Sequence, residues 1–272
     1  MLVFPPCKIN LGLNIVEKRP DGFHNIESVF YSVNWSDSLE ITEAKEEGIE
    51  IISSGLPISG KPEENLILKA FNLLNNKVKT PSLKVYLNKT IPMGAGLGGG
   101  SSDAAAFLKT VNVKFDLNLK NADLLEIATQ LGSDCAFFIE NKTSFATQKG
   151  EALESINLDL SQYYILIVYP PINSSTKEAY DGVIPKKTIK SAKEIVLNET
   201  IENWKDVLVN DFEASIFKKY PEIENIKNAL YQDGALYASM SGSGSAVFGI
   251  FKEKPLLEFP KNYLWHLEEK KV

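Results

Sequence analysis

One glycine-rich tract limits the folds available to this chain more than any other feature. Residues 92–102 read PMGAGLGGGSS, and glycine lets a backbone adopt positive φ angles and approach a ligand closely. An alternating segment at 83–88 precedes the tract, and Ser101 and Ser102 are predicted to cap an alanine-rich helix over 101–111. A flexible linker is not expected between a strand and a capped helix. We therefore interpret the tract as an anion-binding loop at a helix N-terminus.

The residues around the glycines narrow the type of anion loop. A Walker A loop requires a lysine after its last glycine, and this tract has none. Residues 94–99 match the G-x-G-x-x-G pattern of dinucleotide-binding folds only weakly, because that pattern follows a buried parallel strand. The strand here alternates, and Pro92 intervenes. The tract is therefore interpreted as a phosphate loop of another type.

The charge balance indicates that any phosphate-binding site is confined to a small part of the protein. The 272 residues include 29 Lys and Arg against 35 Asp and Glu, which gives a formal charge of −6, and Arg19 is the only arginine. An acidic chain is not typical of a general nucleic-acid binder. Phosphate binding is expected to depend on backbone N–H groups, lysine and metal, because bidentate arginine contacts are available at one place at most.

Composition also predicts a compartment. Two cysteines, Cys7 and Cys135, make no disulfide framework in a chain of this size, which favours a reducing interior. The longest apolar run, 163–169, is far shorter than the roughly 18 residues that span a bilayer. The N-terminal segment contains Pro5 and Pro6 and lacks a small-residue cleavage site, so we interpret it as folded structure. We expect a cytoplasmic protein with no nucleic-acid or membrane partner, and the oligomeric state stays open.

Strand and helix patterns follow one another without strict alternation. A half-buried strand is predicted over 8–15, with Lys8 and Asn10 on its polar face, and the opening is predicted to be a run of antiparallel strands. The further predicted strands are 30–35, 39–42, 49–52, 83–88, 135–139, 163–169, 235–240 and 246–251, and the predicted helices are 65–75, 101–111, 123–131, 203–219 and 222–232. This order is typical of an α+β protein. A polar interval at 150–162 suggests two domains, 1–155 and 156–272.

Several motifs, taken together, resemble those of one enzyme family. The tract fits P-x-G-x-G-L-G-[GS]-[GS]-S, which is similar to the phosphate loop of the GHMP small-molecule kinases, named for galactose, homoserine, mevalonate and phosphomevalonate. The segments KINLGLNI at 8–15, RPDGFH at 19–24, GSDCAFF at 132–138 and SGSGS at 241–245 resemble further motifs in the family's order. The matches cover most of the chain, which makes them more specific than any single motif.

The resemblance implies a fold and an activity. The fold would have an N-terminal ribosomal-protein-S5-like domain and a C-terminal ferredoxin-like α/β sandwich, with ATP and Mg²⁺ in the cleft between the domains. The RPDGFH and GSDCAFF segments resemble the branch that carries out ATP-dependent phosphorylation of the 2-hydroxyl of 4-diphosphocytidyl-2-C-methyl-D-erythritol. That step belongs to non-mevalonate isoprenoid synthesis, and the partner would be this cytidine diphosphate derivative of methylerythritol.

Two residues are predicted to carry the chemistry. Taken alone, Lys8 would more often be a solvated strand residue and Asp134 a turn residue. A kinase needs a base for the acceptor hydroxyl and a cation that balances the charge of the moving phosphoryl group. By resemblance, Asp134 is the general base and Lys8 its charge-balancing partner.

The remaining candidate residues bind ATP, metal or substrate. The predicted nucleotide contacts are Pro92, Met93, Gly94, Ala95, Gly96, Leu97, Gly98, Gly99, Gly100, Ser101 and Ser102. Either serine hydroxyl could contact the metal, and the sequence does not choose between them. By resemblance, Asn10 contacts the alcohol or phosphate of the substrate, His24 and Phe23 contact the cytosine, and Tyr180 closes over the cytidine.

Three positions depart from the family pattern. Phe23 stands where a tyrosine is usual, which keeps stacking possible but removes a hydroxyl. Asp103 replaces the usual asparagine and Ala136 the usual proline. Cys7 and Cys135 are interpreted as small hydrophobic residues, because neither has an obvious histidine partner.

Two rival functions remain at this point. One is a kinase of the same family that acts on homoserine or mevalonate, against which the RPDGFH segment argues. The other is a nucleotide-binding regulator without catalysis, against which the presence of Lys8 and Asp134 argues.

Overall fold

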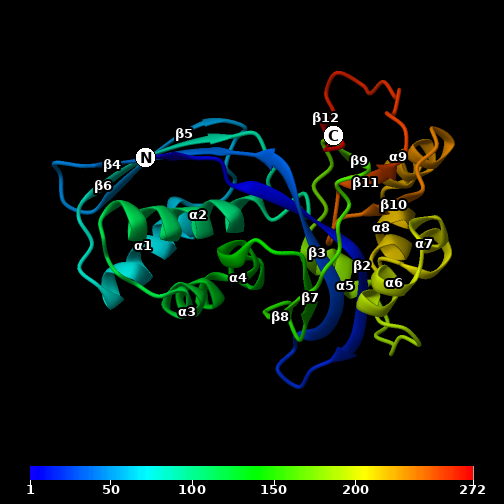
Figure 1. Ribbon diagram of the computed structural model, residues 1–272, viewed down its shortest axis with the longest axis horizontal. Coiled ribbons are helices and arrows are strands. Elements are labelled where there is room, and N and C mark those ends of the chain that lie inside the picture. The colour runs from blue at the N-terminus through cyan, green and yellow to red at the C-terminus, as the bar shows by residue number, and fades with distance from the viewer. Residues whose placement is uncertain (272) are drawn as a thin grey trace. The chain divides into compact units, whose positions relative to one another are not determined.

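Strands and helices are mixed along the computed structural model, which describes residues 1–271 (Figure 1). This mixture confirms the predicted α+β class. The chain forms two compact units, and both are discontinuous. The first unit contains residues 1–7, 34–93 and 98–141, and the second contains 8–33, 94–97 and the chain from 142 onward. The single boundary near residue 155 stays a prediction.

The first unit consists of a four-stranded sheet and a group of helices. The sheet has the order β1-β4-β6-β5, and α2 packs against β4 while α1, α3 and α4 pack against α2 and one another (Figure 1). The elements are β1 (Leu2–Val3), β4 (Ser38–Glu43), β5 (Ile49–Gly55), β6 (Leu83–Lys89), the 3₁₀ helix η1 (Pro62–Glu64), α1 (Leu66–Lys77), α2 (Gly99–Lys114), α3 (Asn121–Leu131) and α4 (Ser133–Glu140).

The prediction of an antiparallel opening is wrong for one strand. β5 pairs with β6 in parallel, with Ile49 opposite Leu83 and Ile51 opposite Val85, whereas β4 pairs with β6 antiparallel. A parallel pair requires a long crossover, and η1 and α1 supply it between the two strands.

The predicted strand at 135–139 is also wrong, because these residues lie in α4 (Ser133–Glu140). All five of them are buried, so no polar position reveals the helical period. A short apolar run of this kind fits a buried strand or a buried helix equally well. The correction places Asp134 in the first turn of a helix, where a carboxylate interacts favourably with the helix dipole.

The second unit contains two sheets and the remaining helices. One sheet has the order β2-β3-β7-β8, and the other is antiparallel with the order β10-β11-β9-β12. The elements are β2 (Pro6–Lys18), β3 (His24–Ser36), β7 (Ser144–Thr147), β8 (Ala152–Ser155), β9 (Tyr164–Tyr169), β10 (Tyr237–Met240), β11 (Val247–Phe251), β12 (Leu264–Glu268), α5 (Thr176–Asp181), α6 (Ala192–Asn198), α7 (Ile201–Val207), α8 (Glu213–Lys219) and α9 (Pro221–Gln232). The first two residues of β2 and the last three of β3 belong to the first unit.

The core of the second unit lies between its antiparallel sheet and α9. Leu166 and Val168 of β9 and Val247 of β11 pack in one cluster with Ile223 and Leu230 of α9. These side chains are almost completely buried, and each contributes on the order of 1.5–3 kcal/mol of hydrophobic stabilisation. The predicted strand at 163–169 is therefore confirmed as a central strand.

The predicted helix over 203–219 is wrong, because the non-helical segment 208–212 separates α7 from α8. The N–H of Leu13 donates to the carbonyl of Val209 at 2.9 Å, and the N–H of Asp211 donates to the carbonyl of Leu13 at 2.8 Å. This pairing with β2 is a contact between residues far apart in the sequence, so local periodicity could not reveal it.

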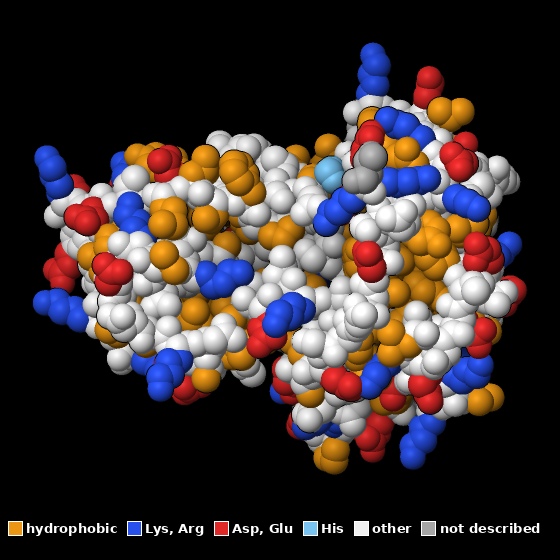
Figure 2. Space-filling view, in the orientation of Figure 1, with side chains coloured by type: hydrophobic (Ala, Val, Ile, Leu, Met, Phe, Trp, Pro, Cys, Tyr) orange, Lys and Arg blue, Asp and Glu red, His pale blue; other side chains and the backbone are white. Residues whose placement is uncertain are grey.

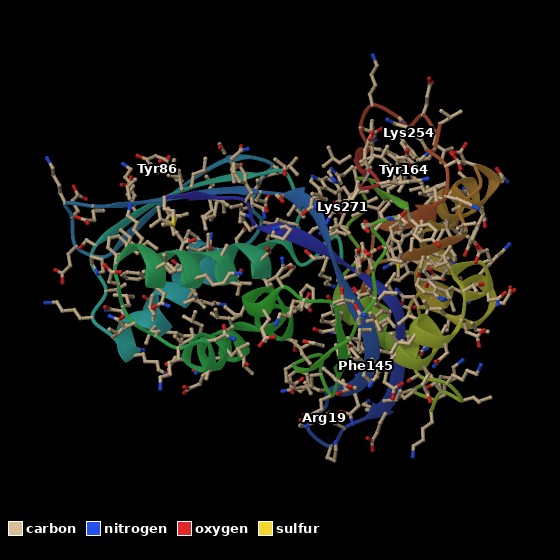
Figure 3. All side chains as sticks on the ribbon, viewed as in Figure 1. Arg19, Tyr86, Phe145, Tyr164, Lys254 and Lys271 are labelled. Carbon is tan, nitrogen blue, oxygen red and sulfur yellow. The ribbon has the colours of Figure 1, made fainter. Side chains whose placement is uncertain are left out.

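The surface in view carries charges of both signs, interspersed with hydrophobic side chains (Figure 2). Arg19 lies in the turn between β2 and β3 (Figure 3), where its guanidinium pairs with Asp21 at 3.0 Å and donates to Asn25 at 3.1 Å. The one arginine therefore holds this turn together. Within residues 1–271, no helix has the length and apolar character needed to cross a membrane.

Candidate functional site

The glycine tract has the backbone geometry that its composition predicts. Gly94, Gly96 and Gly98 have φ angles of 67°, 78° and 69°. A Cβ atom added to Gly96 would lie 1.9 Å from the carbonyl oxygen of Ser241, so only glycine fits there. The helix that follows, α2, begins at Gly99 rather than at Ser101, so both serines lie in its first turn and neither is the cap. The first-turn N–H groups remain suited to binding an anion.

Lys8 is buried within the second unit, and the strand over 8–15 is buried on both faces, so the prediction of a half-buried strand is wrong. Only 4% of Lys8 is exposed. Its Nζ donates to the Asn10 Oδ1 at 2.6 Å and to the carbonyl of Gly96 at 3.0 Å, and it lies 5.1 Å from the centre of the Phe30 ring. A buried ammonium needs such partners, because desolvation of a charge is costly. The structure therefore joins Lys8 directly to the glycine tract.

Asn10 is held by protein groups on both sides of its amide. Its Oδ1 accepts from Lys8, and its Nδ2 donates to the Ser28 Oγ at 2.9 Å. Ser28 in turn donates to the carbonyl of Gly12 at 2.6 Å. This chain of hydrogen bonds orients the Lys8 side chain. The predicted contact of Asn10 with substrate stays a prediction.

Asp134 belongs to the first unit and is partly exposed in the first turn of α4. Its neighbour Cys135 is buried, and burial raises the pKa of this thiol to about 11, with an opposing hydrogen bond from Ser101. The thiol is therefore protonated at neutral pH and is not a nucleophile. Cys7 is likewise buried and unbridged, as expected of a small hydrophobic residue.

Two of the three aromatic residues predicted to contact the cytidine, His24 and Tyr180, lie together in the structure. The rings of His24 and Tyr180 are stacked with centroids 4.7 Å apart and planes 19° from parallel, and Tyr180 also meets the edge of Phe212. Burial, followed by the charge of Lys18, lowers the pKa of His24, which favours the neutral imidazole with one donor and one acceptor nitrogen. Phe23 stands apart from this stack: it is 58% exposed, and the Lys149 Nζ lies 5.1 Å from its ring.

The first unit contains a pocket of about 410 Å³ that no motif in the sequence indicates. Ile51, Leu66 and Leu87 are among its apolar lining residues, and its polar residues include Lys89 and Asp103. Gly100 also lines it, so the pocket reaches the start of α2. Most of the lining comes from β5, β6, α1, α2 and the segment that leads through η1 into α1. The proximity of these elements depends on the sheet order, which the sequence did not reveal.

Three buried charges lie beside this pocket. Lys89 forms ion pairs with Asp37 and, at 2.8 Å, with Asp103, and all three side chains are almost completely buried. The Asp37 Oδ1 accepts the N–H groups of Thr90 and Ile91 at 2.5 and 2.9 Å, just before the glycine tract. Burial raises the pKa of Asp103 to about 7, against the attraction of Lys89. The negative charge of the nearby Asp37 adds to this rise, because one ammonium does not balance two buried carboxylates.

Comparisons with known proteins agree with these features. A family model described as "GHMP kinases N terminal domain" matches residues 65–142, and one described as "GHMP kinases C terminal" matches residues 192–259. The chain is 49% identical over 253 residues to a 4-diphosphocytidyl-2-C-methyl-D-erythritol kinase of Bacteroides fragilis, covering 92% of each chain. A protein of the same name from Cytophaga hutchinsonii is 49% identical over 256 residues, covering 94% of each chain.

A solved structure is also similar. The crystal structure of a 4-(cytidine 5'-diphospho)-2C-methyl-D-erythritol kinase matches with a TM-score of 0.75 and 28% sequence identity, covering 92% of this chain and 90% of that one. The family models, the relatives and the fold agree with the motifs that the chain carries. The chain therefore belongs to the GHMP kinase family and, within it, to the 4-diphosphocytidyl-2-C-methyl-D-erythritol kinases.

Proposed function

We propose that this chain transfers the γ-phosphoryl group of ATP to the 2-hydroxyl of 4-diphosphocytidyl-2-C-methyl-D-erythritol. The observation that carries the proposal is the buried Lys8 ammonium bound to the carbonyl of Gly96 inside the phosphate loop. A cation held at this place balances negative charge as the phosphoryl group moves. The names of the relatives supply the acceptor, and the stacked His24 and Tyr180 rings suit a flat base.

The acceptor hydroxyl must lose its proton during the transfer. Asp134 is proposed as the general base, because it is a partly exposed carboxylate in the GSDCAFF segment. The adjacent thiol of Cys135 is buried and protonated, so it does not compete for this role. Lys8 is proposed to neutralise the developing charge.

The nucleotide is proposed to use two features of the chain. The N–H groups at the start of α2 suit the phosphates, because they carry the positive end of the helix dipole. The apolar pocket lined by Ile51, Leu66 and Leu87 suits the adenine, because it continues to Gly100 of the same loop. The proposed phosphate contacts remain the residues of the tract from Pro92 to Ser102.

Mg²⁺ is proposed to accompany the ATP. No group of three or more His, Cys, Asp or Glu side chains within residues 1–271 could hold a metal ion. Mg²⁺ bound to a nucleotide is held largely by phosphate oxygens and water, so a single protein oxygen is sufficient. The Ser102 Oγ fits this role, because it is buried and lacks a hydrogen-bond partner in the described part of the chain. When bound, the ion would add positive charge at the phosphates.

A phosphotransfer assay tests the proposal. The purified chain is incubated with ATP and Mg²⁺ and with the cytidyl substrate, homoserine or mevalonate in separate reactions, and ADP and phosphorylated acceptor are measured. We expect turnover with the cytidyl substrate alone. Turnover with homoserine or mevalonate instead would assign another acceptor within the family, and nucleotide binding without turnover on any acceptor would indicate a regulator.

A further inference from the structure

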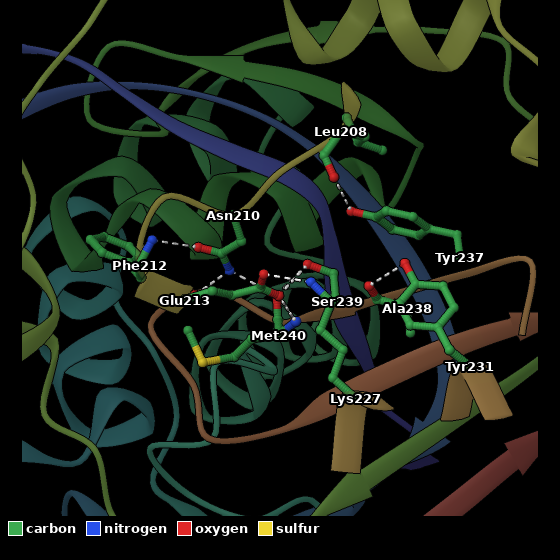
Figure 4. Close-up of polar contacts among 11 residues, drawn as sticks. Leu208, Asn210, Phe212, Glu213, Lys227, Tyr231, Tyr237, Ala238, Ser239 and Met240 are labelled. Carbon is green, nitrogen blue, oxygen red and sulfur yellow. Dashed lines mark hydrogen bonds and ion pairs between the residues drawn. The ribbon is translucent and has the colours of Figure 1, made fainter. Parts of the chain in front are cut away.

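Asn210 lies at the centre of a buried hydrogen-bond network in the second unit (Figure 4). It lies in the segment 208–212 between α7 and α8 and is only 3% exposed. Its Nδ2 donates to the carbonyls of Met240 and Gly242, both at 2.8 Å, and its Oδ1 accepts the N–H of Phe212 at 3.0 Å. Both amide protons and the amide oxygen are therefore used by backbone groups.

The two carbonyls that Asn210 holds belong to the residues on either side of Ser241. Ser241 is buried, and its Oγ donates to the carbonyl of Gly96 at 2.9 Å. Lys8 donates to the same carbonyl at 3.0 Å. The Gly96 carbonyl oxygen in the phosphate loop thus accepts hydrogen bonds from the Ser241 hydroxyl and from the Lys8 ammonium. The position of this oxygen therefore sets the positions of both side chains.

The segment that carries Asn210 is also fixed to the strand that carries Lys8. Backbone hydrogen bonds join Val209 and Asp211 to Leu13 of β2, and the Asp211 Oδ2 accepts the N–H of Ile15 at 2.8 Å. Asn210 therefore connects β2 to the loop after β10. Glu213 supports the same loop, since its Oε1 accepts the N–H of Met240 at 2.8 Å (Figure 4).

We propose that Asn210 is a positioning residue for phosphoryl transfer, which holds Ser241 and, through the Gly96 carbonyl, the phosphate loop and Lys8. The inference rests on the proposed function, because it assigns Lys8 and the loop to catalysis. Catalysis depends steeply on such placement, and a displacement of about 1 Å can lower the rate about a hundredfold. Asn210 itself does not touch substrate in this proposal.

The test compares three variants under the phosphotransfer assay. Asn210→Asp keeps the oxygen that accepts from Phe212 and replaces the donor amide by an oxygen that faces two carbonyls. Ser241→Ala removes the hydroxyl bond to Gly96. Tyr237→Phe is the matched control: it removes the buried hydrogen bond from the Tyr237 hydroxyl to the carbonyl of Leu208 in the same segment, and it leaves the loop after β10 untouched (Figure 4).

We expect Asn210→Asp to lower kcat by at least about tenfold and to raise KM for ATP, with KM for the cytidyl substrate within about twofold of the wild-type value. Ser241→Ala should act in the same direction, and Tyr237→Phe should lower Tm with all three kinetic constants unchanged. If Asn210 acts through Ser241, the double variant should resemble the more severe single variant rather than multiply the two effects.

Some results would overturn the inference. If Asn210→Asp and Tyr237→Phe both lower Tm and leave kcat and KM within about twofold, Asn210 has a structural role alone. Multiplicative effects in the double variant would separate Asn210 from Ser241. If Asn210→Asp does not fold, an unchanged kcat in Ser241→Ala overturns the inference. The affinity for ADP, measured by calorimetry, tests the role of Asn210 independently of the proposed acceptor. This affinity should fall in Asn210→Asp whichever alcohol is phosphorylated, so an unchanged affinity contradicts the inference about Asn210 and not the proposed function.

Discussion

At the scale of single residues, the protein buries the cation of its proposed reaction and leaves the proposed base accessible. Lys8 is 4% exposed and bonded to Asn10 and Gly96, whereas Asp134 is partly exposed at the start of α4. This division has a physical reason. A cation that only balances charge benefits from a fixed, water-poor surrounding, whereas a base must reach the hydroxyl of an incoming substrate.

Asp134→Asn should fold normally and lose about 10²–10⁴ in kcat, because the amide keeps the shape of the carboxylate and does not accept the proton. Steady-state turnover of the cytidyl substrate measures this loss. The matched control is Asp123→Asn, since Asp123 lies in the first turn of α3 as Asp134 does in α4. The control should keep wild-type turnover. Near wild-type activity in Asp134→Asn would remove this residue from the mechanism.

His24→Ala should raise KM for the cytidyl substrate about ten- to a hundredfold and leave KM for ATP unchanged. The change leaves a polar group of the base unpaired, which costs about 1–3 kcal/mol, and removes the ring stacked on Tyr180. The control is His266→Ala, which changes the chain's other histidine, on β12. Phe23→Tyr should be tolerated, because Phe23 is largely exposed. If His24→Ala lowers stability with both KM values unchanged, His24 serves the turn rather than the substrate.

At the scale of elements, the sequence predicts a helix, strand or turn correctly where residues close together in the sequence determine it. The strand over 8–15, the helix over 222–232 and the glycine tract all have strong local patterns, and each is present. Two of the wrong predictions arise from contacts between distant segments of the chain. The break at 208–212 comes from pairing with Leu13, and the parallel pairing of β5 comes from sheet order. The site follows the same rule: Lys8 and Gly96 were both candidates, but their hydrogen bond requires two elements to meet.

Gly96→Ala tests the close approach of the glycine tract to the loop after β10, which contains Ser241. Its Cβ would lie 1.9 Å from the Ser241 carbonyl, and its φ of 78° strains any other residue by about 1–2 kcal/mol. We expect the affinity for ATP to fall sharply and the affinity for the cytidyl substrate to change much less, both measured by calorimetry. Gly96→Val should have the larger effect.

The control for Gly96→Ala is Gly234→Ala, which has a φ of 95° and open space around the added carbon. It isolates the cost of backbone strain, so it should lower the free energy of unfolding by about 1–2 kcal/mol without changing ATP affinity. Equal loss of both ligands in Gly96→Ala would show that the tract is structural and does not bind the nucleotide.

At the scale of the whole molecule, the buried ion pairs of Lys89 with Asp37 and Asp103 predict how the free energy of unfolding depends on pH. In the folded state the pKa of Asp103 is raised to about 7 by burial, whereas its ordinary value is 3.8. Between these values the folded state binds more protons than the unfolded state, so the free energy of unfolding falls as pH rises from about 4 to about 7. A pKa shift of this size lowers the free energy of unfolding by at most about 4 kcal/mol.

Asp103→Asn should remove this part of the pH dependence, because the amide can still accept from Lys89 and has no proton to lose. In urea unfolding without nucleotide or Mg²⁺, the variant should match the wild type near pH 4 and become progressively more stable than it up to pH 7. Asp123→Asn provides a control of opposite sign: hydrogen bonding to Lys77 lowers the pKa of Asp123, so the stability it contributes is lost as pH falls. Parallel curves for the wild type and Asp103→Asn between pH 4 and 7 would mean that Asp103 is ionised throughout, with Lys89 shared equally between two charged carboxylates.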